Sequence, residues 1–158
     1  MRSEILELAR ARGIMIATAE SCTAGMVAAA LTDLAGSSAV FERGFVTYSN
    51  AAKIDMLGVQ AQTLQDHGAV SEQIAEQMAS GALDHSAAQL AVSLTGIAGP
   101  GGSEHKPEGR VCFGLATAKG VTAHTVEFGA LGREAVRQAA CDHALEMLLN
   151  ALAGMPAP

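Results

Sequence analysis

The chain has 158 residues, the length of one domain, and its 49% hydrophobic and 16% charged residues indicate a folded protein with a real core. A formal net charge of −6 argues against a nucleic-acid-binding protein, which needs a basic face to meet phosphates, but permits a small anionic substrate held by local donors. The cysteines are odd in number and form no C-x-x-C pair, which argues against a disulfide framework or a zinc site.

The N-terminal residues 1–5 are typical of a helix start and carry no apolar run followed by a cleavage site, so no signal peptide is expected. Every long apolar stretch is interrupted by Gly, Asp or Ser well short of a membrane span. These features predict a cytoplasmic protein with no membrane or nucleic-acid partner. An apolar chain of this size is also compatible with a homodimer or a higher homo-oligomer.

Apolar spacing in the first half of the chain predicts alternating helices and strands. We expect a helix over 4–12, a buried strand over 14–19, a helix over 23–34, a strand over 41–48, and a short helix over 51–57 with Asn50 as its N-cap. Gly13 ends the first helix, and a turn follows at 36–38. Residues 59–68 form a loop or a short helix.

The second half continues this alternation and then adds a hairpin. Ser71 caps a helix that carries Ile74, Met78 and Ala82, and a compact apolar strand covers 90–94. After an irregular segment over 95–109, two strands over 111–117 and 121–128 are joined by Lys119–Gly120. A final helix over 131–152 turns five residues inward: Val136, Ala140, Ala144, Met147 and Ala151.

This order of elements predicts one α/β domain over residues 1–158. Strands that alternate with helices and end in a hairpin favour a three-layer α/β/α sandwich with a mixed, mainly parallel sheet. No internal repeat, linker or low-complexity tract interrupts it.

The first candidate for chemistry is Ser21, in the segment Ala19-Glu-Ser-Cys-Thr-Ala-Gly25, between a predicted strand and a predicted helix. A hydroxyl there is exposed at the sheet edge, where free N–H groups of the first helical turn at Thr23, Ala24 and Gly25 can form an oxyanion hole. The competing interpretation is a plain serine N-cap. Cys22 is a weaker rival nucleophile, since its side chain points elsewhere.

The second candidate is the pair Tyr48 and Lys53, in Tyr48-Ser-Asn-Ala-Ala-Lys53. A serine hydroxyl is a weak nucleophile and needs a base; a lysine desolvated near Ser21 can be neutral and accept its proton, and a phenol beside it can relay protons. The alternative is a tyrosine at a strand end and a solvated helical lysine.

The third candidate is a glycine-rich loop, in which consecutive N–H groups can form an anion-binding nest and the backbone can approach a ligand closely. Its candidate ligand-binding residues are Thr95, Gly96, Ala98, Gly99, Gly101 and Gly102. No Gly-Lys-Ser/Thr follows and no G-x-G-x-x-G order is present, so it is neither a P-loop nor a dinucleotide fingerprint. A long surface loop without function is the alternative.

Two arginines on the final predicted helix, Arg133 and Arg137, lie one turn apart and are placed to clamp a phosphate, or else belong to a solvated face. The five histidines show no metal-ligand spacing such as H-E-x-x-H and are interpreted as structural or surface residues.

Over most of its length the chain resembles the C-terminal domain of the competence-damage-inducible protein family, CinA. The matching stretches are AESCTAG (19–25), GSSAVFERGFVTYSNAAKIDMLGV (36–59), GAVSEQIAEQMASGA (68–82) and LTGIAGPGGSEHKPEGRVCFGLA (94–116). One departure is Ala24, where family members often have glycine. Longer members carry a second, N-terminal domain; the matching stretches all belong to the C-terminal domain, so no activity of the N-terminal domain is expected from residues 1–158.

The resemblance implies an α/β/α domain that hydrolyses nicotinamide mononucleotide to nicotinic acid mononucleotide and ammonia. It implies a Ser-Tyr-Lys arrangement with Ser21 as nucleophile, Tyr48 and Lys53 as the proton-handling pair, and the 95–102 loop as a wall of the nucleotide site. No metal or cofactor is expected. Two other functions stay open: a non-catalytic nucleotide-binding or regulatory module, and an amidase for another small amide.

Overall fold

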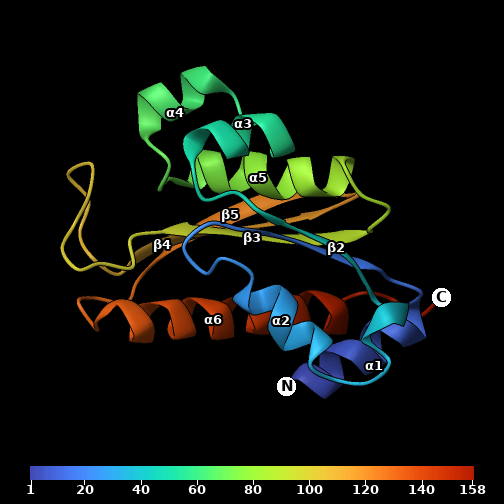
Figure 1. Cartoon of the computed structure of the whole chain (residues 1–158). Helices are drawn as coiled ribbons and strands as arrows, with labels where there is room; N and C mark the ends of the chain where they lie inside the picture. The colour runs from blue at the N-terminus through green and yellow to red at the C-terminus, as the bar shows by residue number, and fades with distance from the viewer.

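The computed structural model describes all residues, 1–158, and is built on one five-stranded sheet (Figure 1). The strand order is β2-β1-β3-β4-β5. The strands are β1 (Ile16–Glu20), β2 (Phe41–Val46), β3 (Leu90–Gly96), β4 (Arg110–Thr117) and β5 (Gly120–Glu127). β1 pairs in parallel with β2 and β3, whereas β4 pairs antiparallel with β3 and β5, so only β4 runs against the other strands. The predicted mixed, mainly parallel sheet is confirmed.

Helices cover both faces of the sheet (Figure 1). One face carries α1 (Arg2–Arg12), α2 (Met26–Thr32) and α6 (Arg133–Ala153), with a short 3₁₀ turn at Ser37–Ala39. The other carries α3 (Asn50–Leu57), α4 (Ala61–His67) and α5 (Glu72–Asp84). The predicted three-layer α/β/α arrangement is therefore confirmed. None of these helices combines the length and apolarity needed to cross a bilayer.

The two central strands are buried because helices cover both of their faces. Every residue of β1 is buried, as are the first six of the seven residues of β3. Edge strand β5, by contrast, alternates between exposed and half-buried residues. The parallel register pairs Glu20 with Leu94 and with Val46, so β1, β2 and β3 end at the same edge of the sheet. The chain segments that follow these strands must meet there.

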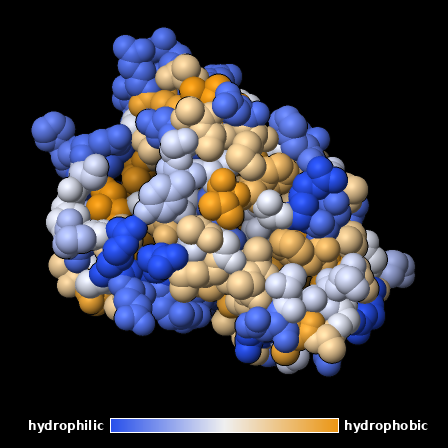
Figure 2. All heavy atoms as spheres, viewed as in Figure 1, coloured by the Kyte–Doolittle hydropathy of each residue, from blue (hydrophilic) through white to orange (hydrophobic).

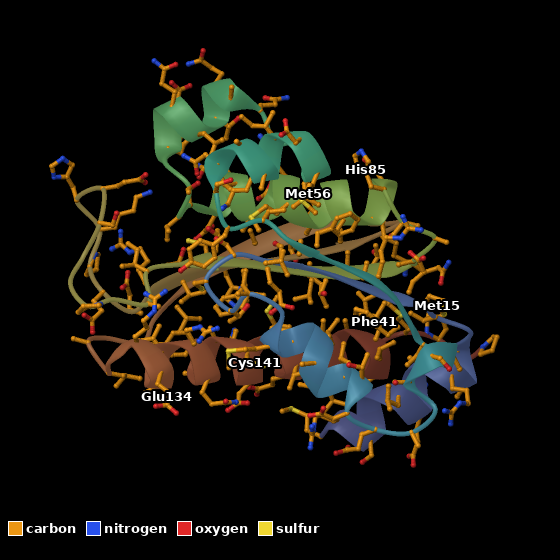
Figure 3. All side chains as sticks on the ribbon, in the orientation of Figure 1. Met15, Phe41, Met56, His85, Glu134 and Cys141 are labelled. Carbon is orange, nitrogen blue, oxygen red and sulfur yellow. The ribbon has the colours of Figure 1, made fainter.

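An aliphatic, alanine-rich core lies on each face of the sheet. The larger cluster joins α1, α2 and α6 to the sheet, and the smaller one lies beneath α3, α4 and α5. Along α6, Cys141 points inward and Glu134 points to solvent (Figure 3). Of the predicted inward residues of this helix, Val136, Ala140 and Ala144 are buried, whereas Met147 and Ala151 are only half-buried at the flank. Leu145, Leu148 and Leu152 are buried in their place.

Three local expectations were wrong, and all three concern the ends of elements near the nucleophile candidate. The expected helix over 23–34 begins only at Met26, because Ala24 (φ 46°) and Gly25 (φ 102°) are left-handed and break helical continuity. The N-cap of α3 is Ser49, whose hydroxyl accepts from the Ala52 amide, and Asn50 is the first helical residue. β2 ends at Val46, which leaves Tyr48 in a loop.

Candidate active site

A cavity of about 330 Å³ lies at the edge where β1, β2 and β3 end, within the size range of small-molecule sites. The loop after β3 and Arg133, the first residue of α6, contribute to its lining. Figure 2 shows this end of the molecule hollowed and rimmed by hydrophilic side chains. The cavity is lined by Ser21, Cys22, Tyr48, Asn50, Lys53, Ala69, Val70, residues 95–104 and Arg133.

Ser21 follows directly after β1 and is held in the sheet frame by its amide, which donates to the Leu94 carbonyl at 3.0 Å. Its hydroxyl faces the cavity and accepts a hydrogen bond from Lys53 Nζ at 3.1 Å. It does not cap α2, because the N-cap of that helix is Gly25 and the hydrogen bond of the Ser21 hydroxyl is to Lys53 and not to an amide of the helix. The plain N-cap interpretation of Ser21 is therefore excluded.

Lys53 lies in the first turn of α3 and is 1% exposed, so it is not a solvated lysine. Besides Ser21 Oγ, its Nζ donates to the carbonyls of Thr47 at 2.8 Å and Tyr48 at 3.4 Å. No carboxylate forms a salt bridge with it. Burial lowers the Lys53 pKa, and the negative charge of Glu104 opposes this only in part. A lysine in this environment loses its proton more readily than one in water.

Tyr48 lies at the rim of the cavity and not beside the serine. Its side chain is 57% exposed, and its hydroxyl accepts from Arg133 Nη2 at 2.6 Å. Arg133 Nη1 donates to the Gly99 carbonyl at 2.6 Å, so this arginine ties Tyr48 to the glycine loop. No hydrogen bond joins the phenol to Ser21 or Lys53, and only the Tyr48 carbonyl touches the lysine.

The glycine-rich loop lines the cavity, and two of its glycines are needed for internal packing. A Cβ on Gly99 would overlap the Glu108 carboxylate, and one on Gly102 would overlap the Lys106 carbonyl. The amide of Gly101 donates to Glu108 Oε1 at 2.6 Å. The amides of Ala98, Gly99 and Gly102 have no acceptor within the chain, whereas Thr95 and Gly96 belong to β3. These three amides are not used within the chain and are free to donate to a ligand.

The backbone amides expected to form an oxyanion hole, those of Thr23, Ala24 and Gly25, lie in a turn that precedes α2 and not in the first turn of a helix. Thr23, Ala24 and Gly25 do not line the cavity, and the Ala24 amide is engaged with the Ser21 carbonyl at 3.1 Å. The amides of Cys22 and Thr23 have no acceptor in the chain. The Cys22 thiol is buried, and burial raises its pKa to about 11, so it stays protonated and is a poor nucleophile.

Arg137, expected beside Arg133 at a phosphate, does not line the cavity. Its Nε donates to the Cys22 carbonyl at 2.9 Å and its Nη2 to the Thr23 carbonyl at 3.4 Å. Arg137 therefore supports the turn after Ser21, and of the two arginines only Arg133 lines the cavity.

Sequence reasoning missed Glu20. This residue directly precedes Ser21 in the chain. Its side chain is 1% exposed and is hydrogen-bonded to Thr23 in the turn that follows Ser21. An acidic residue at the end of an otherwise apolar buried strand was the available signal, because carboxylates are almost never fully buried without partners.

Residues 1–152 match the family model described as the CinA C-terminal domain. The chain belongs to this family. It is 53% identical over 154 residues to the nicotinamide-nucleotide amidohydrolase PncC of Escherichia coli strain K12, covering 92% of this chain and 93% of that protein. A CinA-like protein of Chloroherpeton thalassium is 56% identical over 119 residues, which are 75% of this chain but 28% of that longer protein.

Solved structures of the CinA family have the same fold. The competence/damage inducible protein CihA of Agrobacterium tumefaciens is 53% identical, with a TM-score of 0.85 over 94% of this chain and 95% of that one. The competence damage-inducible protein A of Klebsiella pneumoniae is 38% identical, with a TM-score of 0.94 over 98% of this chain and 96% of that one. The family resemblance inferred from the sequence motifs is confirmed.

Proposed function

We propose that this chain hydrolyses the carboxamide of nicotinamide mononucleotide to nicotinic acid mononucleotide and ammonia, with Ser21 as nucleophile and Lys53 as base. The observation that carries the proposal is the 3.1 Å contact between Lys53 Nζ and Ser21 Oγ at a cavity wall. A serine needs an adjacent base, and a buried lysine with a lowered pKa supplies one. The name of the 53% identical Escherichia coli relative supports the substrate.

In the first half-reaction, neutral Lys53 takes the proton of Ser21 as Oγ attacks the carboxamide carbon. The amide of Cys22, a residue that lines the cavity, has no acceptor in the chain and is the donor we assign to the oxyanion. The Lys53 ammonium then gives its proton to the departing nitrogen, and the C–N bond breaks to release ammonia.

In the second half-reaction, Lys53 takes a proton from water, which attacks the acyl carbon. The bond to Ser21 Oγ breaks, the acid leaves, and Ser21 recovers its proton from Lys53. Because the Tyr48 phenol contacts Arg133 and not Ser21, the proposal assigns proton transfer to Lys53 and binding to Tyr48. The substrate phosphate lies against Arg133 and the free amides of Ala98, Gly99 and Gly102.

Ammonia release from nicotinamide mononucleotide tests the proposal. We expect turnover by the wild type with a chelator present and near-complete loss in Ser21→Ala, because the nucleophilic oxygen is gone while the backbone contacts remain. Ser3→Ala, on the exposed side of α1, is the matched control and should release ammonia at the wild-type rate. Circular dichroism checks that both variants fold.

Other outcomes identify the competing functions. Wild-type activity in Ser21→Ala would exclude the serine mechanism. If the wild type releases no ammonia, a nucleotide-binding module is favoured. Calorimetry can then be used to find the nucleotide that it binds. Equal turnover of nicotinamide and its mononucleotide would indicate an amidase that does not use the phosphate.

A further inference from the structure

We infer that Glu20 is a positioning residue for Ser21: its buried carboxylate caps α2 and thereby fixes the turn of residues 21–25. The inference rests on the proposed function, since the reaction that it affects is the one carried by Ser21.

The Glu20 side chain is enclosed and bonded entirely to the segment that follows Ser21. One carboxylate oxygen accepts from Thr23 Oγ1 at 2.6 Å and from the Val27 amide at 2.9 Å. The other oxygen accepts from the Ala28 amide at 3.1 Å. No Lys or Arg forms a salt bridge with it. The unpaired amides at the N-terminus of α2 therefore stabilise the buried charge in place of a cation.

The turn needs such support because its own residues cannot supply it. The N-cap, Gly25, has no side chain to cap the helix, and Ala24 has a left-handed φ of 46°. That conformation costs an alanine roughly 1–2 kcal/mol. Glu20 holds the turn through α2 and the Thr23 hydroxyl, and Arg137 holds it through the Cys22 and Thr23 carbonyls. Two side chains from outside the turn thus fix its backbone.

Ser21 takes its position from this backbone. Its amide is held by the sheet through the Leu94 carbonyl, and its carbonyl is held by the turn through the Ala24 amide. Successive strand side chains point to opposite faces, so Glu20 points toward α2 while Ser21 points toward Lys53. Glu20 does not line the cavity and is not among the charges that shift the Lys53 pKa. Its effect on the reaction is therefore through geometry.

Glu20→Gln is the informative variant because it keeps the shape and removes one acceptor. An amide NH₂ cannot accept a hydrogen bond. Depending on which way the glutamine amide turns, either the Ala28 amide or the Val27 amide and the Thr23 hydroxyl lose their acceptor. We expect kcat for the mononucleotide to fall about 10-fold to 100-fold, the range for a displacement of about 1 Å at a reacting group. KM should stay within about threefold and the pH of the rate inflection should not move, because Arg133 and the glycine-rich loop, to which the phosphate is assigned, and the burial of Lys53 are not affected.

A second readout measures Ser21 without the substrate. The rate at which a serine-directed sulfonyl fluoride labels Ser21, followed by intact mass, should fall in parallel with kcat. The matched control is Ser71→Ala, which removes the N-cap of α5, a hydrogen bond of 3.3 Å to the Ile74 amide, at a comparable cost in stability. It should lower Tm and leave kcat and labelling at wild-type values.

The possible results separate the inference from the proposed function. Wild-type kcat and labelling in Glu20→Gln, or an equal loss in Ser71→Ala, would overturn the positioning role. No ammonia from the wild type would overturn the proposed function, while the labelling rates would still report on the position of Ser21. If Glu20→Gln does not fold, Thr23→Val removes only the 2.6 Å hydroxyl bond and should show a smaller loss of the same kind, whereas wild-type kcat and labelling there would contradict the inference.

Discussion

At the scale of single residues, Lys53 has the most unusual environment. It is among the largest fully buried side chains, yet it forms no ion pair and its hydrogen-bond partners are two carbonyls and the Ser21 hydroxyl. An unpaired ammonium is costly to bury, and the cost is reduced when the lysine releases its proton. The same burial that disfavours the charge therefore favours a neutral amine beside the Ser21 hydroxyl, which the proposed role of base requires.

This environment predicts the pH dependence of the reaction. Because burial lowers the Lys53 pKa, the neutral base is populated at lower pH than for an ordinary lysine, and kcat/KM should rise with pH through an inflection below 10.5. Lys53→Arg should lose about 10²-fold or more of the rate, because arginine does not give up its proton. Exposed Lys119→Arg is the control. Substantial activity in Lys53→Arg would contradict the role of base.

At the scale of elements, two arginines one turn apart on α6 perform different tasks. Arg133 lines the cavity and bonds Tyr48, whereas Arg137 bonds the carbonyls of the turn after Ser21. Arg133→Ala should mainly raise KM for the mononucleotide, by about 10-fold to 100-fold, since a charge-assisted hydrogen bond contributes about 1.5–3 kcal/mol. Arg137→Ala should mainly lower kcat. Steady-state kinetics of both variants measure this split, and the same response in both would contradict it.

The helix that carries Lys53 depends on a close approach to α5. A Cβ on Gly81 of α5 would overlap the carbonyl oxygen of Leu57, at the end of α3. Gly81→Ala should therefore destabilise the protein by about 1–3 kcal/mol, although alanine favours a helix by about 1 kcal/mol. Gly154→Ala, where a Cβ makes ordinary contacts, should be near neutral. Urea denaturation compares them, and equal stabilities would show that α3 is not packed this tightly.

At the scale of the whole molecule, a histidine pair links the edge strand β5 to α6. His124 Nε2 lies 2.8 Å from His143 Nε2, so one ring must accept from the other. Burial, and then the charge of His124, lowers the His143 pKa below its usual 6.5, with Glu146 opposing. In the unfolded chain His143 therefore takes up a proton near pH 6.5, whereas in the folded chain it is protonated only at lower pH.

Stability should consequently fall as the pH drops from about 7 through 6.5 toward the lowered His143 pKa. His143→Gln should flatten this part of the curve, because the titrating group is gone. The free energy of unfolding measured in urea at several pH values tests the expectation. An unchanged slope in His143→Gln would assign the pH dependence to other groups.

The layered fold was predictable because its signal is local. Apolar spacing marked α5 and α6, and the buried apolar runs marked β1 and β3, since an element must turn its apolar side to the core wherever its partners lie. The ends of elements were less predictable. Ala24 and Gly25 adopt left-handed backbone where composition favoured a helix, because Glu20 and Arg137 hold that turn from outside.

The sequence by itself determined the class of fold and the family, and it made Ser21 and Lys53 candidates, because apolar spacing and short motifs are local features of the chain. Only the tertiary structure decided that Lys53 is buried against Ser21, that Tyr48 lies at the rim, that Arg137 supports the turn and that Glu20 caps α2. These facts depend on the register of β1, β2 and β3, which brings distant segments to one sheet edge. Local periodicity contains no information about which distant residues meet, so side-chain roles that arise from such meetings become visible only in the folded molecule.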